Sequence, residues 1–119
     1  MDFTDSMGMD IVYRNEEKSE VKMKVRDYFY NGINAIHGGV LFTLADTATG
    51  VCANFGNNGA TTLNSSFDFL KPVLEGEFLY AYAKKIKRGK TISVYSVEIF
   101  DDKENLKAHG TFTYYTLRR

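Results

Sequence analysis

One forty-residue segment of this 119-residue chain is almost free of charge. The chain has 30 charged residues, 15 Lys or Arg and 15 Asp or Glu, so a window of that size would hold about ten by simple proportion. The segment from Tyr28 to Phe67 holds one, Asp46. A charge-poor stretch of this length indicates the buried centre of a folded domain. A lone carboxylate there is costly unless it is hydrogen-bonded, paired or used, so Asp46 is either a local capping group or a functional one.

The composition narrows the class of protein. The chain is 44% hydrophobic and 14% aromatic, which is typical of a globular protein, and its length predicts a single domain over residues 1–119. A formal net charge of zero argues against nucleic acid or an anionic membrane as the partner. One Cys allows no internal disulfide and, with two His, leaves no zinc-finger spacing. We therefore expect a cytoplasmic protein with no metal site and no membrane span.

Residues 40–55 carry the one substantial helical pattern. Apolar residues recur there at spacings of three and four, which places them on one stripe. The stripe consists of Leu41, Leu44, Ala45, Ala48, Cys52 and Phe55. Asp46 lies nearly opposite this stripe, and Gly50 one turn later leaves room beside the carboxylate. A helix with no other charge on any face is normally wrapped by other structure, so we predict a central helix over Val40–Phe55.

Strand patterns occupy most of the remaining chain. Alternation and turn signals predict six strands, over Met9–Tyr13, Glu20–Val25, Thr61–Leu70, Glu77–Lys87, Lys90–Phe100 and Leu106–Leu117. The short connections at Arg88-Gly89 and residues 101–105 make the last three antiparallel neighbours. The alternating aromatic residues of the third and fourth strands are interpreted as core side chains, with an aromatic acyl pocket as the alternative: Phe67, Phe69, Tyr80 and Tyr82. A long twisted sheet curled around one helix fits this order, an α+β class, and leaves enough open surface that we expect at least a dimer.

The residues from Asn31 to Ala48, NGINAIHGGVLFTLADTA, resemble a known signature. It is that of hotdog-fold acyl-CoA thioesterases of the PaaI-like (phenylacetate-pathway) branch, in which an Asn is followed six residues on by His-Gly-Gly and an acidic residue lies nine residues after the His. The resemblance continues through Thr62–Pro72 and the turn at Arg88-Gly89-Lys90. It covers Met9 to Leu117, and it implies one long central helix wrapped by a curved antiparallel sheet, assembling as a dimer or a dimer of dimers.

The same resemblance implies an acyl-CoA thioesterase that needs no cofactor beyond its CoA thioester substrate. Asp46 would act as the nucleophile or the general base, and the sequence leaves that choice open. Gly38 would donate its backbone N–H to the oxyanion, a role that suits the unpaired N–H groups at a helix N-terminus. In such enzymes the acid and the glycine of one site come from different subunits, which implies a homodimer or homotetramer.

Three further residues match positions of the signature, and each has a structural alternative. His37 would orient the loop or the thioester, or it caps the helix. Asn31 would hydrogen-bond the attacking water or the carbonyl, although Asn-Gly is also a common turn pair. Thr62 would help to hold the nucleophilic water, or it is an ordinary strand threonine.

A second group of residues is assigned to substrate binding. Gly39 lets the substrate approach the helix terminus closely. Arg88, Gly89 and Lys90 belong to a hairpin rich in Lys and Arg, and its positive charge suits the phosphates of coenzyme A. The alternative is a solvated hairpin tip whose lysines protect a sheet edge.

Two other functions remain open from the sequence. A non-catalytic acyl-CoA-binding hotdog module would keep the fold and the basic turn but would not need the acid. A hotdog hydratase or dehydratase resembles a different layout, with either an Asp-x4-His pair or an active-site His and an acid from the partner subunit. In this chain His37 precedes Asp46, so the first of these two layouts is absent. The identity of the acyl group is not determined by the sequence.

Overall fold

A computed structural model describes residues 2–57 and 59–118 of the chain. Its helices are α1 (Phe3–Ser6), the short 3-10 helix η1 (Asp27–Phe29) and α2 (Gly38–Ala53). Its strands are β1 (Met9–Arg14), β2 (Lys18–Lys24), β3 (Gly59–Phe69), β4 (Phe78–Arg88), β5 (Ile92–Phe100) and β6 (Leu106–Arg118). The six predicted strands and the central helix are all present, with boundaries shifted by a few residues. The single-turn helix α1 was not predicted.

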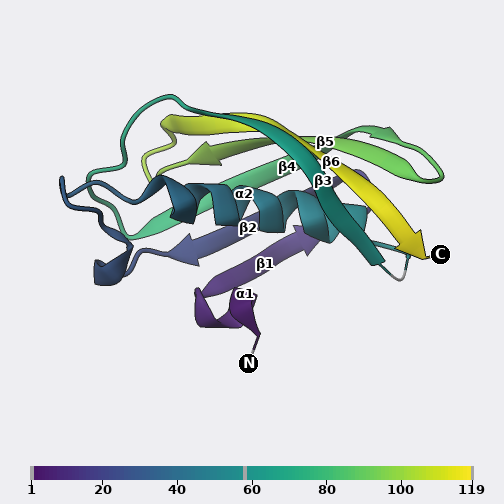
Figure 1. Cartoon of the computed structure of the whole chain (residues 1–119). Coiled ribbons are helices and arrows are strands. Elements are labelled where there is room, and N and C mark those ends of the chain that lie inside the picture. The colour runs from purple at the N-terminus through teal and green to yellow at the C-terminus, as the bar shows by residue number, and fades with distance from the viewer. Residues whose placement is uncertain (1, 58, 119) are drawn as a thin grey trace.

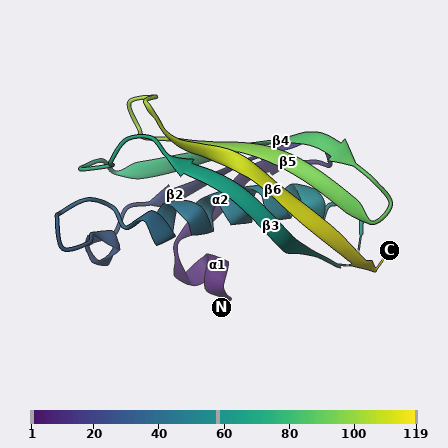
Figure 2. The same cartoon turned by 45° about the horizontal axis from the view of Figure 1, so that its top comes forward.

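The strands form one antiparallel sheet in the order β1-β2-β4-β5-β6-β3. The sheet is strongly curved, and α2 lies along its concave side (Figure 1). Turning the molecule shows β3 and β6 crossing the helix (Figure 2), and α2 contacts every strand of the sheet. The predicted arrangement, one long helix wrapped by a curved antiparallel sheet, is confirmed.

The central helix begins two residues earlier than predicted. His37 is its N-cap, and the helix runs from Gly38 to Ala53 rather than from Val40 to Phe55. Five of the six stripe residues are buried, between 0% and 3% exposed: Leu41, Leu44, Ala45, Ala48 and Cys52. Phe55, the sixth, is 42% exposed because the helix ends before it. The stripe packs against the inner faces of β2, β4, β5 and β6, where the core lies.

Two aromatic residues predicted to be core are exposed in the single chain. Phe69 at the end of β3 is 55% exposed, and Tyr82 on β4 is 39% exposed. Tyr82 lies on the outer face because its neighbours Ala81 and Ala83 fill the inner one. Small residues face the helix at this point, so the alternation placed the larger side chain outside.

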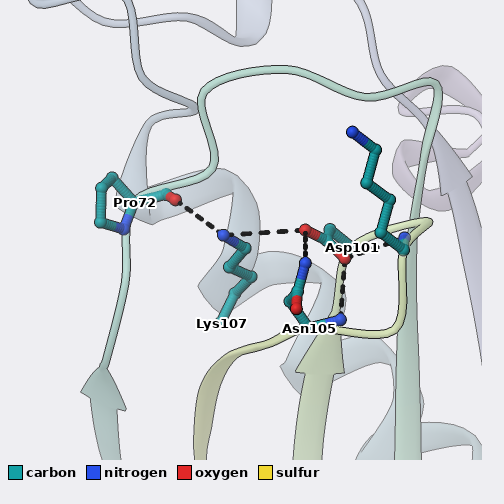
Figure 3. Close-up of polar contacts among 5 residues, drawn as sticks. Pro72, Asp101, Asn105 and Lys107 are labelled. Carbon is teal, nitrogen blue, oxygen red and sulfur yellow. Dashed lines mark hydrogen bonds and ion pairs between the residues drawn. The ribbon is translucent and has the colours of Figure 1, made fainter.

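A polar clamp joins the segment before β4 to the turn between β5 and β6 (Figure 3). Lys107 donates to the backbone oxygen of Pro72 at 3.2 Å and lies 3.7 Å from the Asp101 carboxylate. Asp101 in turn accepts from the backbone N–H of Asn105 and from its side-chain amide. The clamp fixes the loop that follows β3, and part of that loop lines the groove described below.

No helix within the described part of the chain has the length and apolar character needed to cross a membrane.

Candidate active site

The carboxylate of Asp46 lies in the middle of α2, half-buried beside the edge strand β3. The Thr62 hydroxyl on β3 donates a hydrogen bond of 2.6 Å to Asp46 Oδ1. Thr62 itself is exposed in the single chain. The structure therefore brings together two of the predicted site residues, Asp46 and Thr62, which are 16 residues apart in the sequence.

A tyrosine on β6 completes the surroundings of this carboxylate. The Tyr114 hydroxyl lies 2.8 Å from Asp46 Oδ1, 2.8 Å from the Asp46 backbone oxygen and 2.8 Å from Thr49 Oγ1. Gly50 makes room for it, since a Cβ there would lie 3.3 Å from the Tyr114 hydroxyl. Burial raises the pKa of Tyr114 above its ordinary value, and the nearby Asp46 charge raises it further, while hydrogen bonds from Thr49 and Thr62 oppose the shift. The phenol therefore stays protonated at neutral pH and can donate.

The helix N-terminus presents one unused donor. His37 Nδ1 accepts a hydrogen bond of 2.9 Å from the Gly39 N–H, so the predicted capping alternative for His37 is observed. Within residues 2–57 and 59–118 the Gly38 N–H has no hydrogen-bond acceptor. The first N–H groups of a helix have no intrahelical partner and lie at the positive end of its dipole. Gly38 therefore offers an N–H that can receive an oxyanion.

Gly38 opens into a mostly apolar groove of about 310 Å³. Asn31, Ile33 and Phe69 also line this groove. The Phe69 ring lies so close that a Cβ on Gly38 would be 3.2 Å from it. The Asn31 side chain is used within the loop, where its Oδ1 accepts from the N–H groups of Ile33 and Ala35 at 3.0 and 3.1 Å. The amide nitrogen of Asn31 makes no hydrogen bond within the described residues.

The two halves of the predicted site are separated along α2. Gly38 and Asp46 are eight residues apart, which is about 12 Å of helix rise. Asp46 does not line the groove that Asn31 and Gly38 share. Within one chain, the predicted acid and the predicted oxyanion donor are therefore in separate places along the helix.

Arg88 lies at the other end of α2. Its guanidinium donates to the backbone oxygen of Cys52 at 3.1 Å and to that of Phe55 at 2.5 Å. These carbonyls lie at the helix C-terminus, where the dipole favours a positive charge. The structure thus gives Arg88 a capping role that the sequence did not predict. Coenzyme A binding by Arg88, Gly89 and Lys90 stays a prediction.

The family model described as the Thioesterase superfamily matches residues 33–108 of the chain. The chain belongs to the Thioesterase superfamily. It is 35% identical to acyl-coenzyme A thioesterase PaaI of Escherichia coli (strain K12) over 103 residues, which cover 87% of this chain and 74% of that protein.

Two solved structures of similar proteins support the same assignment. The E. coli PaaI protein from the phenylacetic acid degradation operon matches with a TM-score of 0.90 at 30% identity, covering 96% of this chain and 83% of that one. A Streptococcus mutans UA159 protein bound to acetyl CoA matches with a TM-score of 0.87 at 28% identity, covering 93% and 90%. The predicted resemblance to PaaI-like hotdog thioesterases is confirmed, and the fold is the hotdog fold.

The PaaI-like signature marks some of the residues that the structure brings together but not all of them. It marks Asn31, Gly38 and Asp46, of which the first two line one groove and the third lies apart from it beside Thr62. It does not mark Tyr114 or Thr49, which contact each other beside Asp46. The inward alternation of β6 was the available signal, because it places a tyrosine hydroxyl on the face toward the helix.

The described residues hold no group of three or more His, Cys, Asp or Glu side chains placed to bind a metal ion. Cys52 is buried on the helix stripe, and burial raises the pKa of its thiol. The thiol therefore stays protonated at neutral pH, and Cys52 is a core residue and not a nucleophile.

Proposed function

We propose that this chain is an acyl-CoA thioesterase, which hydrolyses a CoA thioester to a free acid and coenzyme A. The observation that carries the proposal is the Asp46 carboxylate, held on one oxygen by Thr62 beside an open sheet edge. Its position on α2 matches the acid of the PaaI-like signature, and a relative at 35% identity bears the name acyl-coenzyme A thioesterase. A similar protein was solved with acetyl CoA bound, which supports a CoA thioester as the ligand class.

The complete site is proposed to form between two subunits. Asp46 and Thr62 of one subunit would meet Asn31 and Gly38 of the other, because about 12 Å of helix separates the two halves within a chain. Each dimer would then carry two equivalent sites, as expected for a two-fold interface. Exposed apolar side chains near the two half-sites support burial by a partner, among them Leu63 at 56% and Ile33 at 80% exposure.

The chemistry follows from which Asp46 oxygen is engaged. Thr62 and Tyr114 both lie on Oδ1, and within the described residues Oδ2 accepts no hydrogen bond. As a general base, Oδ2 would take a proton from water while the water oxygen bonds to the thioester carbon. As a nucleophile, Oδ2 would itself bond to that carbon and form an anhydride for water to open. The two versions both remain within the proposal.

The remaining groups would act on the same carbonyl. The partner's Gly38 N–H would stabilise the oxyanion that forms when the carbon becomes tetrahedral. Collapse of that intermediate breaks the carbon–sulfur bond, and the thiolate of coenzyme A leaves and takes up a proton. Asn31 is proposed to contact the water or the carbonyl through its amide nitrogen, and His37 to hold the glycine turn. Gly39, Gly89 and Lys90 remain candidates for contacts to coenzyme A.

Thiol release from a panel of acyl-CoA substrates tests the proposal. We expect wild type to release coenzyme A, and Asp46→Asn to lose about a hundredfold or more in kcat while still binding coenzyme A. Asp10→Asn, which changes an exposed carboxylate on β1, is the matched control and should keep wild-type activity. Binding of coenzyme A by wild type without turnover of any thioester would overturn the proposal and favour the non-catalytic binding module.

A further inference from the structure

Two residues of one cross-strand pair hold the Asp46 carboxylate. Thr62 on β3 and Tyr114 on β6 are direct register partners in the sheet, so their side chains leave the same face. Both reach Asp46 Oδ1, at 2.6 Å from the threonine and 2.8 Å from the tyrosine. The register shifts immediately after this pair, between Thr62 and Asn64.

The chemistry of the acceptor atoms fixes the direction of the hydrogen bond between Tyr114 and Asp46. A backbone oxygen only accepts, and the Tyr114 hydroxyl donates both to the Asp46 backbone oxygen and to Asp46 Oδ1. The Tyr114 oxygen also lies 2.8 Å from Thr49 Oγ1, and either hydroxyl can be the donor of that bond. Thr49 is held in place by its own turn of α2, where Oγ1 donates to the backbone oxygens of Ala45 at 3.0 Å and Asp46 at 3.2 Å. A chain of two hydroxyls therefore runs from the buried side of the helix to Asp46 Oδ1.

The surroundings keep this chain rigid. Tyr114 is 2% exposed and Thr49 is fully buried, so water does not compete for their hydroxyls. The Tyr114 ring packs against Tyr95 with ring centres 6.2 Å apart. Asp46, in contrast, is only half-buried and lies on the open side. Tyr114 thus holds Oδ1 from the core, and within the described residues Oδ2 accepts no hydrogen bond.

We propose that Tyr114 is a positioning residue for Asp46, and that Thr49 orients the Tyr114 hydroxyl through their shared hydrogen bond. Tyr114 orients the carboxylate so that Oδ2 is presented to the substrate, without touching the substrate itself. This inference rests on the proposed function, in which Asp46 is the reacting acid. Misplacement of a reacting group by a fraction of an ångström costs rate and not substrate affinity. The signature of the role is therefore a loss in kcat with KM unchanged.

Tyr114→Phe tests this, because it removes the hydroxyl and keeps the ring. A hydrogen bond to a charged group is worth enough that kcat should fall about tenfold or more, with KM within about twofold of wild type. Tyr95→Phe is the matched control. Tyr95 is also fully buried on the neighbouring strand, and its hydroxyl has no hydrogen-bond partner among the described residues. It should keep wild-type kcat.

A second pair of variants separates positioning from a general structural role. Thr49→Val removes the hydroxyl that sets Tyr114 and should lower kcat, whereas Thr49→Ser keeps a hydroxyl and should restore it. Equal kcat for Tyr114→Phe and Tyr95→Phe, in an active wild type that Asp46→Asn inactivates, would overturn the positioning role and leave the proposed function standing. If Thr49→Ser loses as much kcat as Thr49→Val, the packing of the Thr49 side chain matters and not its hydroxyl. That result would overturn the role proposed for Thr49. Absence of thioesterase activity in wild type would instead overturn the proposed function.

Discussion

Thr62 on the edge strand β3 donates a 2.6 Å hydrogen bond to Asp46 on the central helix α2. β3 has a neighbour on one side only, since it ends the sheet beyond β6. The Asp46 carboxylate is thus held through Oδ1 at a sheet edge, and within the described residues Oδ2 accepts no hydrogen bond.

Loss of the Thr62 hydroxyl should lower turnover. Thr62→Val keeps the shape of the side chain and removes the donor to Asp46 Oδ1, so kcat/KM for a good acyl-CoA substrate should fall about tenfold. Thr62→Ser keeps the hydroxyl and should stay within a few-fold of wild type. Steady-state thiol release measures both. If kcat/KM of Thr62→Val equals that of wild type, Thr62 is an ordinary strand threonine, which is the alternative that the sequence left open.

A methyl group on Gly38 should impair activity with little effect on stability. The added Cβ would lie 3.2 Å from the Phe69 ring, which is exposed and free to move, and alanine is the better helix former. Gly38→Ala should therefore unfold within about 1 kcal/mol of wild type but lose about tenfold or more in kcat, because the methyl enters the groove beside the N–H. Urea unfolding and thiol release give the two values. Recovery of activity in Gly38→Ala/Phe69→Ala would show that crowding by the ring, not access to the N–H, causes the loss.

Arg88 should matter for stability more than for substrate binding. Arg88→Met removes two charge-assisted hydrogen bonds to the end of α2 and should cost about 1–3 kcal/mol in the free energy of unfolding. Lys87→Met, which changes the exposed neighbour on the same strand, should cost little. Denaturant unfolding and KM for an acyl-CoA are both to be measured. A raised KM at unchanged stability would instead support the coenzyme A contact predicted from the sequence.

The sequence predicted the helix and strands because their patterns are local. The stripe from Leu41 to Cys52 and the alternation along each strand depend only on neighbours in the chain. The placement of β3 beside β6 was not predictable in that way, since it pairs Thr62 with Tyr114 across 52 residues. The same long-range pairing brings Tyr114 to Asp46. A strand tyrosine gives no local sign of the carboxylate that it contacts.

The burial of Phe69 and Tyr82 was predicted wrongly, and the capping role of Arg88 was not predicted at all. Phe69 and Tyr82 were interpreted as core because large aromatic residues favour burial, yet both are more than a third exposed. Hydrophobicity does not tell which face of a strand meets the helix when both faces carry apolar residues. Arg88 likewise gave no sign of its carbonyl partners, because those belong to the end of a helix more than 30 residues earlier.

Asp101 should stabilise the fold in a pH-dependent way. Burial pushes the pKa of Asp101 up, but hydrogen bonds from Asn105 and Lys103 and the charge of Lys107 outweigh it, so its pKa lies below the ordinary 3.8. A folded-state pKa below the unfolded one stabilises the fold above pH 3.8, and this contribution is lost as the pH falls through the folded value. Asp101→Asn should therefore destabilise the chain by about 1–2 kcal/mol at pH 7 and progressively less below pH 3.8. Urea unfolding across that range checks it, and a pH-independent difference would contradict it.

Two inactive variants should restore activity when they share a dimer. Asp46→Asn damages the acid half of each site and Gly38→Ala the oxyanion half, and these halves lie about 12 Å apart along one helix. If each site takes one half from each subunit, a mixed dimer has one site with both defects and one intact site. Random mixing makes half of the dimers mixed, so unfolding and refolding an equal mixture should recover about a quarter of wild-type activity. Each variant refolded alone is the control. Activity of the mixture no higher than the mean of the two controls would mean that both halves of a site come from one chain, which the separation of Gly38 from Asp46 argues against.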